Sequence, residues 1–237
     1  MNLENRVVII AGATGGLGRV VVRQFAEQGA RLALIGRSAE RLEKVVEESH
    51  LADGRWMIHT GDLAKPGAAQ AAVEAVIGTW GRAEILLHLV GGWTGGKQVT
   101  EVAEEEISEM LQQHLWTTFG MAQAVVPHLV ENQWGRLIVI SSPYAAAPRA
   151  KGAPYAIAKA AQETLFLTLA QELKGSGVTA NVLLVNTIDV DHARDREPKS
   201  RNASWSTPEE IASAMLYLCS DEARMVNGAR IPLYGSP

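Results

Sequence analysis

The chain has 237 residues, of which 47% are hydrophobic and 20% are charged, with a formal net charge of −4 and one cysteine, Cys219. This composition is ordinary for a globular protein, and the length suffices to bury a sizeable core without disulfides. The 22 basic residues form no block or stripe, which argues against a nucleic-acid or anionic-membrane surface. No segment approaches the roughly 18 apolar residues of a membrane span. We therefore expect a cytoplasmic protein with neither nucleic-acid nor membrane partners.

Short apolar runs alternate along the chain with stretches whose apolar residues recur at helical spacing. Strands are expected at 6–11, 31–36, 55–61, 84–91, 135–141, 178–185 and 229–234. Helices are expected at 16–29, 39–49, 67–80, 101–132, 154–177 and 207–220. Because strands that alternate with helices pair in parallel through right-handed crossovers, the sequence predicts an α/β protein. It would be a single doubly wound, Rossmann-like domain over 1–237, with about seven parallel strands and helices on both faces.

The segment 189–204 is polar and too long for an ordinary turn. Its many charges and few apolar groups leave little surface to bury against the cost of ordering. We expect it to be either a mobile lid, ordered when a ligand binds, or a disordered loop. Trp205 follows directly and would pack where the lid returns to the core.

A glycine-rich stretch, AGATGGLG at 11–18, joins the first expected strand to the first expected helix. Gly12, Gly16 and Gly18 follow the spacing G-x-x-x-G-x-G. Without side chains, the backbone can turn sharply and approach a pyrophosphate at the helix N-terminus, where amide groups favour an anion. The alternative is a merely tight strand-to-helix turn.

Tyr155 and Lys159 are four residues apart, so they share one face of an expected helix. An adjacent ammonium can lower a phenol pKa from about 10 by roughly 1–3 units, which favours general acid or base use. Ser142 lies at the end of a strand thirteen residues before Tyr155 and could hydrogen-bond a substrate oxygen beside it. The alternative is an ordinary tyrosine and lysine on an amphipathic helix.

The stretch VGGWTGGKQ at 90–98 nearly matches a triphosphate-binding loop, but Gln98 stands where a magnesium-binding hydroxyl is needed. We therefore expect a different use. Trp93, flanked by glycine pairs, could form a flat apolar wall for a ring-shaped substrate. The alternative is a tryptophan that caps the core under a flexible loop.

The combination of S-x12-Y-x3-K with the glycine motif resembles the short-chain dehydrogenase/reductase family over nearly the whole chain. The resemblance implies hydride transfer between a nicotinamide cofactor and a carbonyl or imine carbon. Tyr155 would be the proton donor, Lys159 would lower its pKa and bind the ribose, and Ser142 would polarise the substrate oxygen. Substrate contacts are expected at Trp93, Ser142 and Tyr155. The implied cofactor contacts are Gly12, Thr14, Gly16, Leu17, Gly18, Arg37, Asp62, Leu63, Gly91, Tyr155, Lys159 and Ile188.

The chain departs from the family pattern at three places. His88 stands where the family usually has an asparagine after its fourth strand, and Val185-Asn186 stands in the place of Pro-Gly. His114 aligns with the helix asparagine often counted as a fourth catalytic residue. A histidine could hold a proton-relay water only in a suitable tautomer. His114 is therefore either a catalytic residue or a helix histidine packed near the site.

The segments GGWTGG, LWTT and SWSTPEE resemble those of dihydropteridine reductases, a branch of this family. That branch would imply a pterin-like substrate in place of a general carbonyl compound. A second alternative is a catalytically silent NADP-binding sensor or assembly subunit.

The end of the second expected strand determines the cofactor preference that the resemblance implies. An acidic residue there favours NAD in the family, but this chain has Gly36 followed by Arg37. A guanidinium suits a 2′-phosphate because it binds phosphate oxygens through paired bonds, so NADP is expected over NAD. The alternative for Arg37 is a solvated charge. No metal is expected, because the histidines lack ligand spacing, and the family habit implies a homo-oligomer, either a dimer or a tetramer.

Overall fold

The computed structural model describes residues 3–235; the first two and last two residues of the predicted domain lie outside this part. Seven parallel strands form one sheet in the order β3-β2-β1-β4-β5-β6-β7. The predicted fold class is therefore confirmed. The strands are β1 (Val7–Ala11), β2 (Arg31–Gly36), β3 (Trp56–Thr60), β4 (Ile85–His88), β5 (Gly135–Ser141), β6 (Val178–Leu184) and β7 (Arg230–Pro232).

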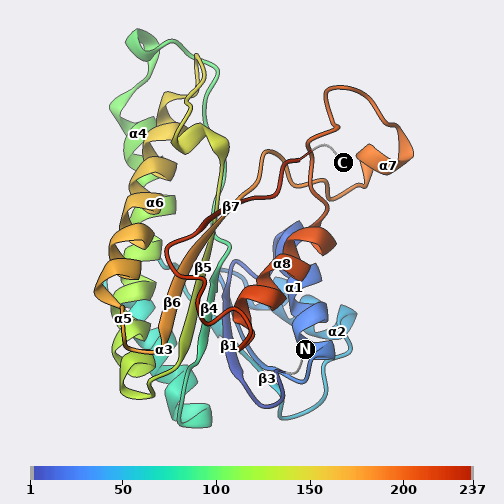
Figure 1. Ribbon diagram of the computed structural model, residues 1–237, viewed down its shortest axis with the longest axis vertical. Coiled ribbons are helices and arrows are strands. Elements are labelled where there is room, and N and C mark those ends of the chain that lie inside the picture. Colours follow the sequence, from blue (N-terminus) through green and yellow to red (C-terminus); the bar gives the residue numbers. More distant parts are fainter. Residues whose placement is uncertain (1–2, 236–237) are drawn as a thin grey trace.

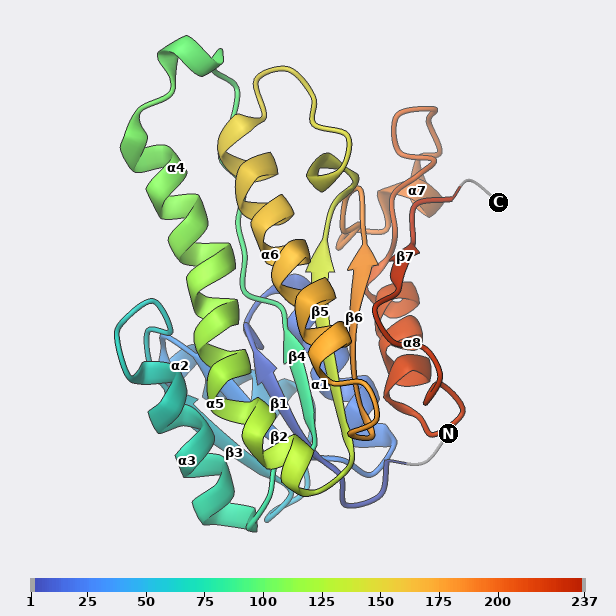
Figure 2. The same cartoon turned by 60° about the vertical axis from the view of Figure 1, so that its left-hand side comes forward.

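Helices cover both faces of the sheet (Figure 1). On one face lie α1, α2 and α8, and on the other lie α3, α5 and α6, with α4 extending α5 beyond the sheet (Figures 1 and 2). The helices are α1 (Gly16–Glu27), α2 (Ala39–Glu48), α3 (Ala68–Trp80), α4 (Glu104–Leu111), α5 (Thr117–Glu131), α6 (Ala153–Glu172), α7 (Ala193–Arg196) and α8 (Pro208–Cys219).

The alternation of side chains along β1 shows why the sheet must be covered on both faces. Val8 and Ile10 belong to the core under α1 and α8, whereas Val7 and Ile9 belong to the core under α3, α5 and α6. All four are fully buried. Successive residues of a strand point to opposite faces, and a parallel sheet buries both, so an unbroken apolar run is the expected sequence.

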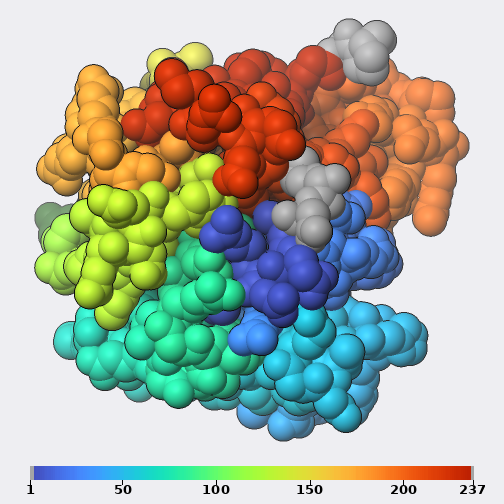
Figure 3. All heavy atoms as spheres, turned by 60° about the horizontal axis from the view of Figure 1, so that its bottom comes forward, coloured from blue at the N-terminus to red at the C-terminus, as the bar shows by residue number. Residues whose placement is uncertain are grey.

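The strand order reverses at the centre of the sheet, and this places the site. β1 lies between β2 and β4, so the chain leaves β1 toward one edge and later returns to fill the other half. In such sheets the crevice beyond the carboxyl ends at this point receives the ligand. At the opposite end of the sheet, Figure 3 shows the amino-terminal segment, in blue, between the C-terminal part, in red, and the cyan and teal segments.

The predicted helix at 101–132 is broken into several parts. A short 3-10 turn, Val99–Glu101, precedes α4, and a π-helical segment, Gln112–Trp116, separates α4 from α5. Threonine hydroxyls donate hydrogen bonds to backbone carbonyls in this segment: Thr117 donates to the carbonyl of Gln113, and Thr118 donates to that of His114. Apolar periodicity does not reveal a one-residue widening of a helix, and such π segments often lie at functional sites.

The segment 189–204 forms a short helix and a set of local hydrogen bonds in this structure. It contains α7, and the Asp189 carboxylate accepts hydrogen bonds from the backbone N–H groups of Ala193 and Arg194, each at 2.8 Å. The Asn202 amide donates to the carbonyls of Ala193 and Glu197. Local side-chain caps therefore replace the apolar contacts that the segment lacks. The proposed lid movement stays a prediction.

Candidate active site

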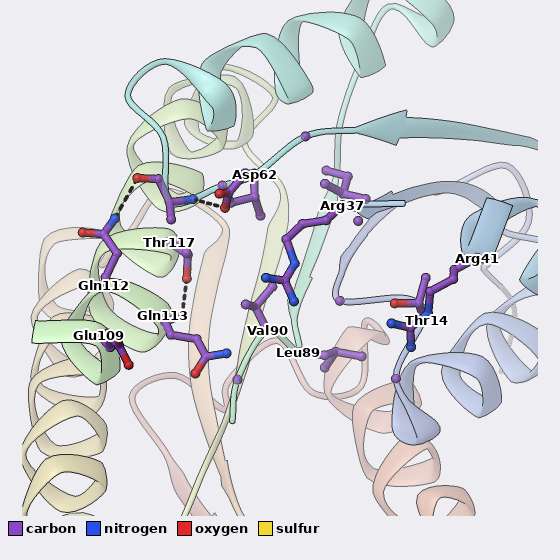
Figure 4. A pocket seen from close by; sticks show the side chains of 18 of the residues that line it. Thr14, Arg37, Arg41, Asp62, Leu89, Val90, Glu109, Gln112, Gln113 and Thr117 are labelled. Carbon is purple, nitrogen blue, oxygen red and sulfur yellow. Dashed lines mark hydrogen bonds between the residues drawn. The ribbon is translucent and has the colours of Figure 1, made fainter. Parts of the chain in front are cut away.

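A cavity of about 500 Å³ lies beyond the carboxyl ends of β1, β2 and β4. It occupies the point where the strand order reverses, as predicted for a doubly wound sheet. Figure 4 shows Arg37 and Arg41 on one side of it and Glu109 and Gln113, from α4 and the π-helical segment, on the other. Six of the predicted cofactor contacts line it, namely Gly12, Thr14, Arg37, Asp62, Leu63 and Gly91.

The glycine turn fits a nucleotide because added side-chain atoms would fill it. A Cβ on Gly12, whose φ is +91°, would lie 2.9 Å from the backbone carbon of Leu89 and from the nitrogen of Val90. A Cβ on Gly18 would lie 2.5 Å from the carbonyl oxygen of Gly12. These distances are too short for any real Cβ atom. Only glycine at position 12 lets the turn lie against the chain that follows β4, and only glycine at position 18 lets α1 start this close to the turn. The residues present therefore fit the pyrophosphate of a dinucleotide at the start of α1.

The other predicted residues of this turn lie behind the cavity lining. A Cβ on Gly16 would meet the Val190 side chain at 2.7 Å, so Gly16 lies against the segment 189–204. Leu17 is buried in the core beneath α1. Ile188 forms an isolated bridge to Ser206 and packs against the same core. These residues support the glycine turn and the segment that packs on it, while Gly12 and Thr14 line the cavity itself.

Two arginines border the end of β2, where no carboxylate stands. Gly36 ends the strand, and Arg37 and Arg41 both line the cavity. In Figure 4 the guanidinium of Arg37 extends into the cavity, and Arg41 lies beside Thr14. Within residues 3–235, Arg37 forms no hydrogen bond or ion pair, so its charge is available to an anion. Sequence reasoning missed Arg41, although its place in the first turn after the Ser38 cap was a usable signal.

The predicted catalytic residues converge at the carboxyl end of β5. Ser142 directly follows the strand and is buried, and Tyr155 and Lys159 lie on α6. The Lys159 ammonium lies 5.9 Å from the centroid of the Tyr155 ring. Lys159 donates hydrogen bonds to the carbonyl of Ile140 at 2.8 Å and to the amide oxygen of Gln162 at 2.9 Å. The lysine is therefore held against β5 and beside the tyrosine.

The pKa values in this cluster differ from the predicted direction. Burial raises the pKa of Tyr155 above its usual value of 10, while hydrogen bonding with Ser142 opposes the rise. Burial lowers the pKa of Lys159 to about 7, against the attraction of Glu163. Near neutral pH the lysine is only partly charged, and it has little power to acidify the phenol. The hydroxyl of Ser142, and not the ammonium, favours ionisation of Tyr155 in this state.

His114 lies between Tyr155 and the loop after β4. Its ring packs edge-on against that of Tyr155, with centroids 5.6 Å apart. Its Nε2 lies 3.0 Å from the carbonyl oxygen of Gly92, so Nε2 carries the hydrogen and donates it. The longer approach of the Gly92 N–H, at 3.5 Å, is incompatible with that tautomer. Burial lowers the pKa of His114 to about 3, so the ring is neutral, and its unpartnered Nδ1 can accept a hydrogen bond.

His88 ends β4 and is fully buried next to the π-helical segment. Its Nε2 lies 3.1 Å from the hydroxyl of Thr117, which itself donates to the carbonyl of Gln113. The imidazole therefore donates to the threonine, and Nδ1 has no partner within residues 3–235. Burial lowers its pKa to about 3. This histidine holds the end of β4 against the first residue of α5 and stays neutral near neutral pH.

Trp93 lies on the surface and not in the core. Its side chain is 63% exposed, so the alternative of a core-capping tryptophan is wrong. The ring lies against Gly95, where a Cβ would come within 2.8 Å of it. The adjacent Gly96 N–H donates to the carbonyl of Lys151 at 2.7 Å, which joins this loop to the one before α6. An exposed aromatic face beside the site is compatible with the predicted substrate wall.

The cavity lining does not include every predicted site residue, and it includes several that were not predicted. Ser142, Tyr155, Lys159, His114 and Trp93 lie outside the lining. His114 lies next to it, since a Cβ on Gly91 would come within 2.8 Å of the imidazole. Sequence reasoning assigned no cofactor contact to the other lining residues, which are Gly15, Ile35, Gly36, Arg41, Gly61, Ala64, Leu89, Val90, Glu109, Met110, Gln112, Gln113 and Thr117. Seven of these lie at or shortly after the ends of β1, β2, β3 and β4, where the rule for parallel sheets was the available signal. The other six lie on α2, α4, the π-helical segment and α5.

Two further properties concern residues 3–235. No cluster of three His, Cys, Asp or Glu residues there could hold a metal ion. No helix in this range combines the length and apolar character needed to cross a bilayer.

Known proteins resemble this chain over nearly its full length. The family model described as short chain dehydrogenase matches residues 6–201. A (2S)-((R)-hydroxy(phenyl)methyl)succinyl-CoA dehydrogenase subunit, BbsD, of Thauera aromatica is 29% identical, covering 96% of this chain and 94% of its own. The 3-oxoacyl-(acyl-carrier-protein) reductase FabG of Vibrio cholerae is 28% identical, covering 99% and 98%.

Solved structures of short-chain dehydrogenases also match this chain. A short chain dehydrogenase from Bacillus anthracis superposes with a TM-score of 0.85 at 27% identity, covering 96% of this chain and 94% of its own. A short-chain dehydrogenase/reductase variant from Serratia marcescens gives 0.87 at 26% identity, covering 98% and 97%. The glycine turn, the cavity at the strand reversal and these matches agree: the chain belongs to the short-chain dehydrogenase/reductase family and is an NAD(P)-dependent oxidoreductase.

Proposed function

We propose that this enzyme is an NADPH-preferring reductase of a carbonyl compound, with Tyr155 as the proton donor. The observation that carries the proposal is the convergence of Ser142, Tyr155, Lys159 and His114 at the carboxyl end of β5, beside the nucleotide-sized cavity. A silent sensor would not need a half-buried phenol next to a buried hydroxyl. The non-catalytic alternative is not carried further, because the family assignment supports an enzyme.

The residues divide the work as follows. NADPH, when bound, supplies the hydride. The raised pKa of Tyr155 keeps its proton in place near neutral pH, so the phenol can donate it to the substrate oxygen as charge develops there. The Ser142 hydroxyl donates a hydrogen bond to the same oxygen. In its ammonium form Lys159 has one N–H donor beyond those used by Ile140 and Gln162, and this donor serves the cofactor ribose.

The charge at the end of β2 supports NADPH over NADH. Arg37 and Arg41 offer two guanidinium groups at one wall of the cavity, and Gly36 presents no carboxylate to a ribose hydroxyl. A 2′-phosphate would gain charge-assisted bonds from arginine there, whereas NADH would leave the arginines without an anionic partner.

The test is the oxidation of NADPH and NADH in the presence of a panel of substrates. The panel contains 3-oxoacyl thioesters, because named relatives reduce or oxidise acyl compounds, together with simple ketones, aldehydes and a quinonoid dihydropterin. We expect turnover with at least one carbonyl compound and a lower KM for NADPH than for NADH. Tight binding of NADPH without turnover on any member would overturn the catalytic proposal.

A pterin is the second candidate substrate, and Trp93 is the observation that favours it. The indole is 63% exposed next to the site, so a flat heterocycle could stack on it. Turnover of the quinonoid dihydropterin in the panel, lost in Trp93→Ala, would support the resemblance to dihydropteridine reductases. Equal turnover in the variant would remove that support.

We further propose that the enzyme is a cytoplasmic homo-oligomer. Three large apolar side chains on the outer faces of the π-helical segment, α5 and α6 are exposed by 52%, 39% and 43%, namely Trp116, Phe119 and Ile157. Burial of this surface against a second copy would stabilise a dimer or a tetramer. The one cysteine, Cys219, is buried and free, which suits a reducing compartment. Light scattering of the eluted protein measures the number of subunits.

A further inference from the structure

Gln162 is a buried polar residue that the proposed chemistry does not use. It lies on α6, three residues after Lys159, and its side chain has no exposure to solvent. Its amide oxygen accepts a hydrogen bond from the Lys159 ammonium at 2.9 Å. Its amide nitrogen donates to the Thr118 hydroxyl at 2.7 Å and to the carbonyl of His114 at 3.2 Å. All of its amide groups therefore have partners inside the protein.

The chemistry of these partners allows only one orientation of the amide. In its ammonium form Lys159 has donors and no acceptor, so this form requires the oxygen of Gln162. The carbonyl of His114 can only accept, so it requires the nitrogen. Rotating the amide by half a turn would place two donors together at one end and two acceptors together at the other. The network thus fixes the amide, and a fixed amide fixes the lysine.

The bridge joins two parts of the site that are far apart in sequence. The carbonyl of His114 belongs to the π-helical segment Gln112–Trp116 and also accepts a hydrogen bond from Thr118, at 2.5 Å. On the other side, Lys159 is bound to the carbonyl of Ile140 in β5 at 2.8 Å. Gln162 therefore connects the segment that carries His114 to the lysine, and β5 holds the lysine from the far side.

We propose that Gln162 is a positioning residue that directs the Lys159 ammonium toward the cofactor and couples it to the π-helical segment. The inference rests on the proposed function in that Lys159 serves the cofactor. With Ile140 and Gln162 each taking one N–H, only the third donor of the ammonium can point to a ligand. An apolar side chain at position 162 would leave the ammonium with one fixed partner and the carbonyl of His114 with one donor fewer.

Several titratable groups surround Lys159 and must be considered in any pH measurement. Glu163, on the same helix, is held by the Ser141 hydroxyl and by Arg230 of β7, each at 2.6 Å. His88 and His114 face the lysine from β4 and from the π-helical segment, and both stay neutral. Tyr155 completes the set on α6. Of these groups, only Glu163 carries a charge close enough to favour the ammonium.

The first experiment is a double-mutant cycle in which the affinity for NADPH is measured by a fluorescence titration. Gln162→Met should weaken binding by about three- to tenfold, which is the range for one lost hydrogen bond. Lys159→Met should weaken it more. If Gln162 acts through Lys159, the double variant should bind as Lys159→Met does. Gln171→Leu, an exposed glutamine on the same helix, is the control and should bind as the wild type does.

The inference would be overturned if the double variant lost affinity by the product of the two single losses, or if Gln162→Met bound NADPH as tightly as the wild type. The affinity of the wild type for NADPH is a separate measurement that tests the proposed function alone. Thermal unfolding checks that each variant is folded. If Gln162→Met does not fold, the pH dependence of stability in Gln162→Glu decides the question, because this variant keeps an oxygen for the lysine.

A second measurement needs no cofactor. The buried Lys159 has a pKa of about 7 in the folded protein against an ordinary value of 10.5, so unfolding takes up a proton in that window, and stability rises as pH increases from 7 to 10.5. Gln162→Glu places a carboxylate next to the ammonium and should flatten this rise. The same substitution in Lys159→Met should have no such effect. An unchanged slope in Gln162→Glu would contradict contact between the two side chains.

Discussion

The two sides of this active site are built in different ways. The nucleotide side is a surface of backbone, where Gly12 and Gly18 bring chain segments together more closely than any side chain would permit. The chemical side is a cluster of buried side chains from β4, β5, the π-helical segment and α6. Two histidines, a lysine and a tyrosine there have shifted pKa values.

This difference predicts that substitutions on the two sides will have different effects. On the nucleotide side, an added atom displaces backbone and damages both folding and cofactor binding. On the chemical side, an isosteric exchange leaves the fold intact and changes the reaction or its pH dependence. Substitutions on the nucleotide side should therefore act through the volume of the new side chain, and those on the chemical side through changes in proton transfer and protonation.

Removal of the Tyr155 hydroxyl should produce the largest effect. We expect Tyr155→Phe to lower kcat by about 10²- to 10⁴-fold, the range for a lost general acid, with NADPH affinity nearly unchanged. Steady-state kinetics and a fluorescence titration measure the two quantities. If the variant keeps most of its turnover, another group donates the proton, and the chemical side has been assigned wrongly.

Two glycine substitutions test the nucleotide side against each other. A Cβ on Gly18 meets the carbonyl oxygens of Gly12 and Ala13 at 2.5 and 2.6 Å, so Gly18→Ala must move backbone. The three atoms nearest to a Cβ on Gly16 all belong to the side chain of Val190, which is half exposed and can shift. We expect a clear loss of thermal stability and of NADPH binding in Gly18→Ala and a much smaller loss in Gly16→Ala. Equal losses would contradict a rigid backbone surface.

Charge reversal at Arg37 should affect one cofactor more than the other. Arg37→Asp removes a phosphate partner and adds repulsion, so NADPH binding should weaken by about ten- to a hundredfold and NADH binding far less. Lys44→Asp makes the same charge change on exposed α2 and serves as the control. An unchanged ratio of the two dissociation constants would show that Arg37 does not bind the 2′-phosphate.

The buried histidines should make the protein sensitive to acid. His88 and His114 each have a folded pKa of about 3 against an ordinary value of 6.5. Unfolding therefore takes up protons below pH 6.5, and stability, highest above that value, falls as pH decreases toward 3. His114→Asn should remove one of these protons and reduce the slope of unfolding free energy against pH. Urea unfolding between pH 4.5 and 7.5 measures it, and an unchanged slope would mean that His114 does not stay neutral.

The smallest effect is expected in the segment 189–204. Its caps at Asp189 and Asn202 are local, and Val190, against Gly16, is itself half exposed. We expect its backbone amides to exchange faster without ligand and to become protected with NADPH and a substrate analogue. Hydrogen exchange followed by mass spectrometry measures both states. Equal protection in the two states would show a static surface loop and exclude the lid.

The fold was largely predictable because its signals are local. Each strand is a short apolar run and each helix an amphipathic stretch, and both patterns depend only on neighbouring residues. All seven strands were predicted to within a few residues, with the largest difference at β4, which ends at His88 and not at residue 91. There the chain leaves the sheet to form the cavity wall, and a glycine-rich run after a strand does not show where pairing stops.

The sequence by itself determined which elements form, where the glycine turn lies, and the spacing that places Tyr155 and Lys159 on one helix face. Only the tertiary structure decided the protonation of these groups. Burial of Lys159 between β5 and α6 lowers its pKa, and burial of Tyr155 raises the pKa of the phenol, opposite to the lowering that the sequence predicted. The bridge from Gln162 to the π-helical segment also appeared only in three dimensions. Spacing along a chain is a local property, but desolvation and hydrogen bonding depend on what distant segments bring to the same place.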